Sequence, residues 1–207
     1  PPPLEPGTTS TAGAESRIDH RGEVELHADG SATLRLEQHY DGRYAVQLRS
    51  VLANVPTARR QDVVEAQLLG LALPGGRVTE LDIPNLDALD EPVKLSMTIE
   101  VPNLARVAAG ELVLEVPFLG SIARLVQLPS RETPLYISER MATRTRVDLR
   151  VTLPAGAELG GPLPQAKSSE ALVSVTVRDR TEGSVLRLER EIEIPAGRVQ
   201  PDAYPAF

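Results

Sequence analysis

Three histidines, His20, His27 and His39, are the side chains in this sequence best suited to metal binding or proton transfer. The alternation of apolar residues around them predicts two antiparallel strands joined by the loop Asp29-Gly30-Ser31. In that arrangement the rungs that carry His27 and His39 are six residues apart, which is about 20 Å at about 3.3 Å per residue. The two cannot share a metal, since a zinc site needs several convergent groups, and the sequence favours surface histidines.

Nucleophilic chemistry has equally little support. The sequence contains no cysteine, which excludes disulfides, thiol catalysis and sulfur-ligated metal within it. It also lacks the G-x-S-x-G, P-loop and H-E-x-x-H motifs. Ser31 lies in a hairpin loop with no base in reach. We therefore predict no catalytic, cofactor-binding or metal-binding residue in this chain.

Acidic residues gather around one loop, PNLDALDEP, with Asp82, Asp87, Asp90 and Glu91 in it or beside it. Oxygen ligands on a flexible loop suit Ca²⁺, but this spacing matches no calcium-loop template. We favour a solvated acidic loop, because clusters of charge usually serve solvation.

Arg190 stands between Leu188 and Ile192 on the apolar face of a predicted strand. Either its guanidinium is buried against a carboxylate, or a β-bulge turns the side chain out to solvent. Both alternatives are structural, and we favour them over a role in ligand binding.

Composition narrows the classes of partner. The net charge is −7 with no run of basic residues, which disfavours nucleic acid. Four tyrosines, two phenylalanines and no tryptophan leave little aromatic surface for stacking sugars. No apolar run reaches the roughly 18 residues of a membrane span, and no signal peptide is visible. The start at Pro1 instead of Met indicates a piece of a longer chain.

The fold is organised around residues 93–101, where apolar and polar residues alternate. A period of two places one face of a strand in a core and the other in water. Similar patterns on both sides predict a mainly β chain of antiparallel β-sandwich sheets, with one short helix near residues 58–69. Further strands are predicted at residues 78–83, 112–116, 135–137 and 144–153, with a closing hairpin over 173–194 whose loop is Arg180–Gly183.

The first three predicted strands form a meander within residues 24–48. The register that matches their apolar faces gives the pairs Ala28–Ala32, His27–Thr33, Arg21–His39 and Tyr40–Tyr44. After Pro56, the residues Val64, Leu68 and Leu71 recur at helical spacing. They predict a helix over 58–69 that ends at Gly70 and covers the meander.

The chain divides into a linker over 1–19, a β-sandwich half with the helix over 20–105 and a second half over 106–207. One continuous domain is the alternative. Residues 117–130 fit either a helical turn or a buried connection, and residues 154–165 form a Pro/Gly loop.

The order of several segments resembles a known module. The segments are ADGSATL, DGRYAVQLR, PNLDALDEP, VKLSMTIEVPN, PSRETPLYI, VTLPAG and LEREIEIP. Their order and spacing are similar to the β-rich domain of unknown function that follows the transglutaminase-like core in large bacterial proteins. Arg131 and Pro134-Leu135 match a recurrent Arg-x-x-Pro-Leu pattern of that family, which we interpret as structural.

This resemblance implies a non-catalytic accessory module that packs on the neighbouring transglutaminase-like domain or positions substrate for it. The family's catalytic Cys, His and Asp belong to that neighbour, so no catalytic residue carries over and no cofactor is implied. The family implies a periplasmic or cell-envelope location. The alternative is a free-standing cell-envelope module that binds protein or glycan.

Overall fold

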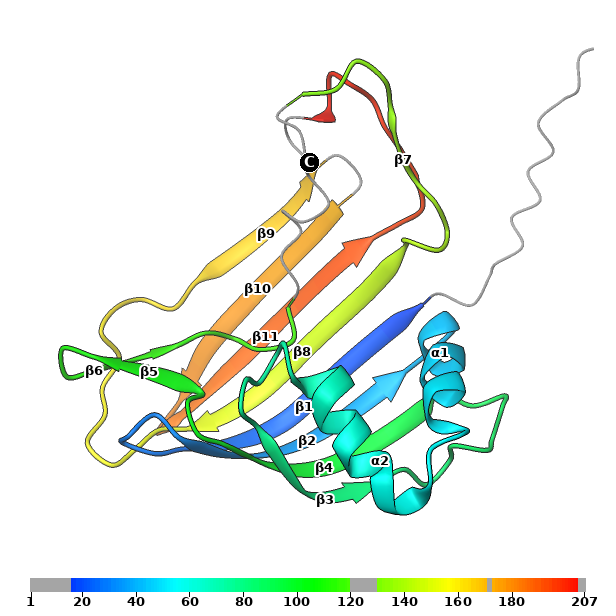
Figure 1. Ribbon diagram of the computed structural model, residues 1–207. Coiled ribbons are helices and arrows are strands. Elements are labelled where there is room, and N and C mark those ends of the chain that lie inside the picture. Colours follow the sequence, from blue (N-terminus) through cyan, green and yellow to red (C-terminus); the bar gives the residue numbers. More distant parts are fainter. Residues whose placement is uncertain (1–15, 120–129, 171–172, 205–207) are drawn as a thin grey trace, which may run out of the picture.

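A computed structural model describes residues 16–119, 130–170 and 173–204 of the chain (Figure 1). The chain is mainly β, as the alternating sequence predicts. The strands are β1 (Arg17–Leu26), β2 (Ala32–Tyr40), β3 (Arg77–Asp82), β4 (Val93–Val101), β5 (Ala105–Ala108), β6 (Glu111–Leu114), β7 (Leu135–Ile137), β8 (Thr143–Thr152), β9 (Gln165–Glu170), β10 (Val173–Glu182), β11 (Val185–Ile194) and β12 (Gly197–Val199). The helical segments are α1 (Arg43–Leu52), α2 (Thr57–Val64) and the π-helical turn η1 (Glu65–Leu69).

Eight strands form one sheet in the order β3-β4-β2-β1-β8-β11-β10-β9, while β5–β6 and β7–β12 make two small sheets. Neighbours in the large sheet are antiparallel except β1 and β8, which run parallel. The sheet is therefore mixed, whereas the sequence predicted antiparallel sheets. Alternating apolar residues fit both orientations equally well, so the pattern could not distinguish them.

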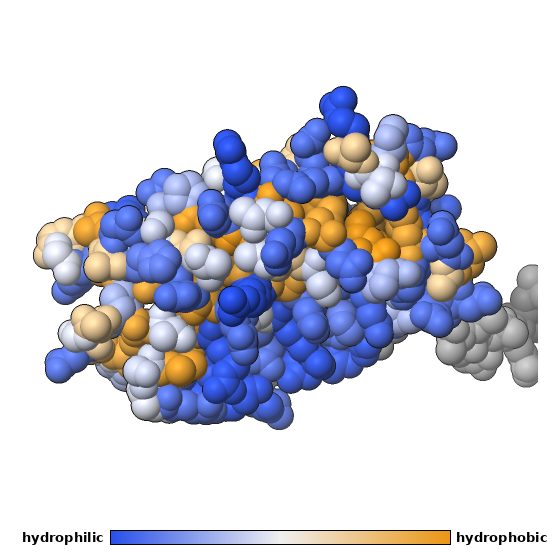
Figure 2. Space-filling view, turned by 90° about the horizontal axis from the view of Figure 1, so that it is seen from below, coloured by the Kyte–Doolittle hydropathy of each residue, from blue (hydrophilic) through white to orange (hydrophobic). Residues whose placement is uncertain are grey.

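One face of the large sheet, here called the inner face, carries α1 and α2 (Figure 1). Leu95, Met97 and Ile99 of β4 are buried on it, while Lys94 and Ser96 point the other way and are exposed, as predicted. Equivalent positions of β1, β2, β8 and β11 belong to the same core, together with apolar residues of α1, α2 and η1. The opposite, outer face is polar, and polar side chains fill the lower middle of the view from below (Figure 2). A smaller core of Ile137, Val173, Ile194, Val199 and Tyr204 joins β7 and β12 to the ends of β10 and β11.

The hairpin of β1 and β2 has the predicted faces but a different register. Leu26 lies opposite Ala32, which leaves residues 27–31 as the loop in place of three residues. Both strands keep their inward side chains, because a shift by two preserves the alternation. Gly30 in this loop has a φ of 85°, and a Cβ there would lie 2.2 Å from the carbonyl oxygen of Ala105. The tip of the hairpin is therefore packed against the start of β5.

The third strand of the predicted meander is wrong, because Arg43–Leu52 forms helix α1. Tyr44, Val46 and Leu48 alternate as in a strand, which suggested the meander. Ala45, Leu48 and Leu52 are also three and four residues apart, and these are the buried apolar positions of α1, while Val46 is exposed. The segment forms a helix and not a strand because a helix here covers the inner face of the sheet, whose apolar residues must pack against a second layer.

The helix predicted near residues 58–69 is confirmed, but its last turn is π-helical. It follows Pro56 as N-cap and ends with Leu69 before Gly70. The predicted apolar stripe is wrong at its end, because Leu71 is 91% exposed while Leu69 is buried. The wider i→i+5 turn of η1 brings Leu69 into line with Val64, five residues earlier. Among the described residues, α1 and the helix of α2 continued by η1 thus lie on the inner face, where the sequence predicted one helix.

The remaining strand predictions hold, but the closing hairpin has a different loop, and β5, β9 and β12 were not predicted. The closing hairpin turns through Gly183-Ser184, with Glu182 opposite Val185, and not through the predicted four residues. Strand β9 was not predicted, because QAKSSE contains no apolar alternation. The strand predicted at residues 112–116 is confirmed as β6, the second strand of a hairpin with β5. Residues 1–15 of the predicted linker and residues 120–129 of the ambiguous segment lie outside the described residues.

Candidate functional site

The outer face of the large sheet is hollowed and densely charged. A hollow of about 680 Å³ crosses β3, β4, β2, β1, β8 and β11. Its charged lining residues are Arg21, Arg35, Arg150 and Arg187, with Glu23, Glu37, Glu80, Asp82 and Asp148.

Strand pairing sets this pattern of charge. Arg21 lies between Glu37 and Asp148 on neighbouring strands, and Glu23 lies between Arg35 and Arg150 in the next outward-facing row. Positive and negative side chains thus alternate across β2, β1 and β8, which is the arrangement that cross-strand pairs favour. On β11 the order changes, because Arg187 lies opposite Arg150 and Glu189 lies opposite Asp148. The result is a surface of mixed charge and not a field of one sign.

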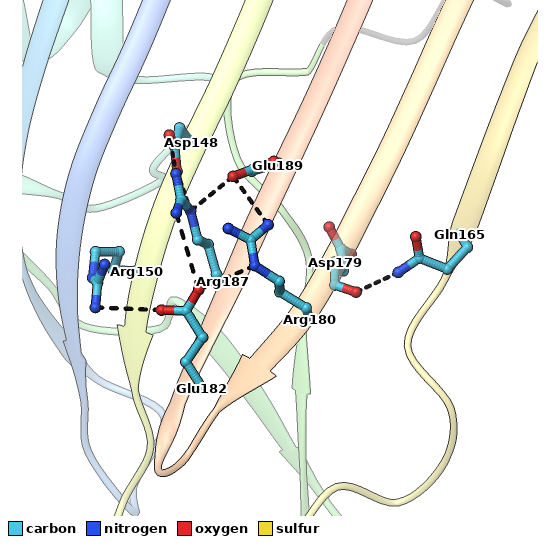
Figure 3. A network of polar contacts seen from close by, with 8 residues as sticks. All are labelled: Asp148, Arg150, Gln165, Asp179, Arg180, Glu182, Arg187 and Glu189. Atoms are coloured by element: carbon cyan, nitrogen blue, oxygen red, sulfur yellow. Dashed lines mark hydrogen bonds and ion pairs between the residues drawn. The ribbon is translucent and has the colours of Figure 1, made fainter.

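Arg187 on β11 is the centre of an ion-pair network on this face (Figure 3). Its guanidinium donates to both carboxylate oxygens of Asp148, at 3.2 and 3.0 Å, and lies 2.8 Å from Glu189. The hydrogen bond with Asp148 raises the pKa of Arg187. Further ion pairs join Glu189 to Arg180, and Glu182 to Arg150 and Arg180. The bidentate geometry fixes the guanidinium plane, so this part of the face is already organised.

Arg21 and Arg35 differ from Arg187, because neither forms an ion pair with any residue that the structure describes. Both are exposed on the same hollow. A planar guanidinium without a fixed partner can take a carboxylate in a bidentate hydrogen-bonded pair. These two arginines are therefore the groups of the hollow most available to an incoming acidic side chain.

A chain of buried polar groups lies on the inner face of β1 and β2. The Tyr40 hydroxyl donates to Oε1 of Gln38 at 2.9 Å, and Nε2 of Gln38 donates to Nδ1 of His20 at 2.8 Å. The His20 ring stacks on Phe118 with centroids 4.5 Å apart. Burial lowers the pKa of His20 to about 4 and raises the pKa of Tyr40, so both side chains are neutral at pH 7.

The prediction of a surface histidine is wrong for His20. The signal was present in the sequence, since His20, Gln38 and Tyr40 stand at the same inward positions as the apolar residues of their strands. The hydrogen bonds within the group explain why polar side chains are tolerated there, because each buried polar group finds a partner.

This buried histidine predicts that acid destabilises the fold. The pKa of His20 is about 4 in the folded state and 6.5 when unfolded, so the unfolded state binds more protons as the pH falls below 6.5. The stabilisation is complete above pH 6.5 and is lost towards pH 4. Between pH 7.5 and pH 5 we expect His20 alone to lower the free energy of unfolding by about 2 kcal/mol.

Urea denaturation at the two pH values measures this loss, with His20→Gln as the comparison. Other acids titrate in both proteins, so the stability difference between wild type and variant isolates the histidine. We expect that difference to shrink by about 2 kcal/mol on going to pH 5. An unchanged difference would contradict the lowered pKa of His20.

The acidic loop of residues 83–92 is organised by an arginine. Arg49 of α1, only 8% exposed, donates through Nε to the carbonyl of Leu86 at 3.0 Å. Its NH2 group donates to the carbonyls of Ala88 and Glu91. Main-chain carbonyls of the kind that bind Ca²⁺ thus converge on a guanidinium, while Asp87 and Asp90 are exposed.

Arg190 is half-buried and pairs with a fully buried carboxylate, which agrees with the first of the two alternatives and not with the second. Its NH2 group lies 2.5 Å from Oδ2 of Asp179 on the neighbouring strand β10. Both side chains point to the inner face, and no bulge interrupts the pairing of β10 and β11.

The structure does not bring the three histidines together. His20 is on the inner face, His27 lies in the hairpin loop, and His39 pairs with Asp19 on β1. Ser31 shares a hollow of about 490 Å³ with His27. Its hydroxyl donates to Oδ1 of Asp29 at 2.6 Å and lowers the pKa of that carboxyl. In the described part of the chain, no three His, Cys, Asp or Glu side chains gather as a metal site requires.

Comparison of the chain with protein-family models, with curated proteins and with solved structures finds no match. Within the described ranges, no helix combines the length and apolar character needed to cross a membrane.

Proposed function

We propose that this chain is a non-catalytic accessory module of a bacterial transglutaminase-like protein of the cell envelope. In this proposal the outer face of the large sheet contacts the neighbouring catalytic core or holds a protein substrate for it. The neighbour and the compartment rest on the sequence resemblance. The contact surface rests on the geometry of the outer face.

The observation that carries the proposal is the open outer face, hollowed across six strands and lined by both signs of charge. Charges placed in fixed positions give specificity and orientation to protein–protein contacts. Arg21 and Arg35 supply hydrogen-bond donors that no described residue uses in an ion pair. The mixed signs favour a folded protein surface over a polyanion such as nucleic acid, which selects a positive patch.

The alternative is a free-standing cell-envelope module that binds protein or glycan, and the outer face gives little support to glycan as its ligand. Sugar-binding surfaces usually present aromatic rings on which sugar faces stack, and none of the residues that line the hollow is aromatic. Protein therefore remains the better-supported ligand for either version of the proposal.

Two measurements test this function. The gene that encodes the chain should encode a core with Cys, His and Asp in that order ahead of it. That core, purified separately, should bind the chain in isothermal titration calorimetry. We expect the double variant Arg21→Glu/Arg35→Glu to weaken binding at least about tenfold, because it places like charges at the contact.

The double variant Arg59→Glu/Arg140→Glu makes the same change of charge at exposed positions away from the outer face and should bind normally. Absence of such a core would remove the accessory role. Equal weakening by both double variants would show that net charge, and not the outer face, governs binding. Binding to isolated peptidoglycan in the absence of any core would support the free-standing alternative.

A further inference from the structure

The two edges of the large sheet are treated differently by the fold. At β3 the outward N–H of Val78 donates to Oε1 of Glu65 at 2.7 Å, and its carbonyl accepts from Nε2 of Gln61. Gln61 and Glu65 are four residues apart along α2 and η1, so they take the place of a neighbouring strand. A bulge between Val78 and Glu80 further distorts this edge. These are the devices by which proteins prevent an added strand from pairing.

At the other edge, β9 presents main chain that pairs with no further strand in the described part of the protein. Nε2 of Gln165 donates to the carbonyl of Asp179, which shows that Asp179 directs its carbonyl towards β9. The N–H and C=O groups of alternate residues point to opposite sides of an antiparallel strand. Val175 and Val177 therefore bond to β9 through their partners Ser168 and Ala166.

It follows that Gln165, Lys167 and Ser169 direct their N–H and C=O groups away from the sheet. The side chains of residues 165–169 are all exposed. No described side chain forms a hydrogen bond to this edge in the way that Gln61 and Glu65 do at β3. Strand β9 is thus an edge whose outward donors and acceptors pair with no residue that the structure describes.

The side chains beside the β9 edge determine which kind of strand could pair with it. On the outer face Lys167 and Arg178 carry positive charge, and neither forms an ion pair with a described residue. On the inner face Ala166 and Ser168 are small and lie beside the half-buried Val175 and Val177. A strand added next to β9 would place alternate side chains on these two surfaces.

We propose that the free edge of β9 accepts an extended segment of a partner protein as a ninth strand, in which acidic and apolar residues alternate. Its acidic side chains would lie beside Lys167 on β9, with Arg178 one strand further into the sheet, and its apolar side chains would lie beside Ala166 and Ser168. Main-chain hydrogen bonds supply affinity in this mode of recognition, and alternate side chains supply specificity. The proposal concerns a different surface from the outer-face hollow and does not depend on the transglutaminase-like neighbour.

The probe is a soluble hexapeptide of alternating glutamate and valine, with a lysine–valine hexapeptide of equal length as its control. We expect saturable binding of the glutamate peptide to the whole chain in isothermal titration calorimetry. Amide hydrogen exchange should slow at Lys167 and Ser169, whose N–H groups point outwards. Binding of both peptides alike, or slowed exchange at another strand only, would overturn the proposal.

Two substitutions at one residue separate the edge from the fold. Ser169→Pro removes an outward N–H and leaves the pairing with β10 intact, a position at which proline is tolerated. We expect Ser169→Pro to abolish binding and Ser169→Ala to retain it. Lys167→Glu/Arg178→Glu should weaken binding of the glutamate peptide by about tenfold.

The outer-face variant Arg21→Glu/Arg35→Glu should bind the glutamate peptide normally, which distinguishes this site from the proposed function. If the peptide fails to bind and the chain forms dimers that Ser169→Pro dissociates, a second copy is the occupant and the proposal is wrong. Binding that survives Ser169→Pro in a folded variant would also contradict it.

Discussion

Replacing Arg49 by alanine is expected to lower the free energy of unfolding by about 4 kcal/mol, because it removes three charged hydrogen bonds at once. The guanidinium is almost fully buried between α1 and the loop of residues 83–92, and it donates to the carbonyls of Leu86, Ala88 and Glu91. Without Arg49 the carbonyls of Leu86 and Glu91 lose this donor, while the carbonyl of Ala88 keeps the N–H of Glu91. The loop also loses its only link of this kind to the helix among the described residues. Urea denaturation at pH 7.5 measures the loss.

Arg59→Ala is the matched control, since it also removes an arginine from a helix on the inner face. Arg59 is 73% exposed and pairs with Asp62 within the same helix. Its removal should change the free energy of unfolding by about 0.5 kcal/mol or less, as for other exposed pairs. Arg49→Lys should lie between the two, because an ammonium cannot reach three carbonyls in the plane of a guanidinium. Equal effects of Arg49→Ala and Arg59→Ala would show that Arg49 does not hold the loop.

The sequence predicted secondary structure correctly where the apolar residues fit only one periodicity, either that of a strand or that of a helix. Strand β4 was predicted at its observed bounds, because residues 93–101 fit a period of two and no helical period. Residues 43–52 fit both periods, and the choice between them depended on the exposed inner face, which no local pattern contains. The π-helical turn η1 also lacked a local signal, so Leu69 and Leu71 were assigned to the wrong sides.

Contacts between distant segments were mostly beyond the sequence. Arg49 reaches the loop from about 40 residues away, and nothing in the spacing of either segment indicated that contact. The parallel pairing of β1 with β8 was also not predictable from the sequence, since a parallel and an antiparallel orientation bury the same side chains. Arg190 was the exception, because a charge at an inward position requires a partner unless a bulge turns it out. The sequence therefore predicted a carboxylate partner as one of two alternatives, without identifying Asp179.

The ion pair of Asp179 and Arg190 predicts unequal effects for its two members. Asp179 is 1% exposed and Arg190 is 24% exposed, on the inner face of β10 and β11. Arg190→Met leaves a fully buried carboxylate without its cation, and we expect a loss of about 4 kcal/mol in the free energy of unfolding. Asp179→Leu leaves a guanidinium that can still reach water, and we expect a loss of about 2 kcal/mol.

The double variant Asp179→Leu/Arg190→Met decides whether the pair itself stabilises the fold. Two apolar side chains of similar volume avoid the cost of removing both charges from water, so the double variant should lie within about 1 kcal/mol of wild type. The coupling energy from this cycle, measured by urea denaturation at pH 7.5, should therefore be large and of opposite sign to the single losses. Additive losses would mean that Asp179 and Arg190 stabilise the sheet independently, and that the inner face of β10 tolerates each charge without the other.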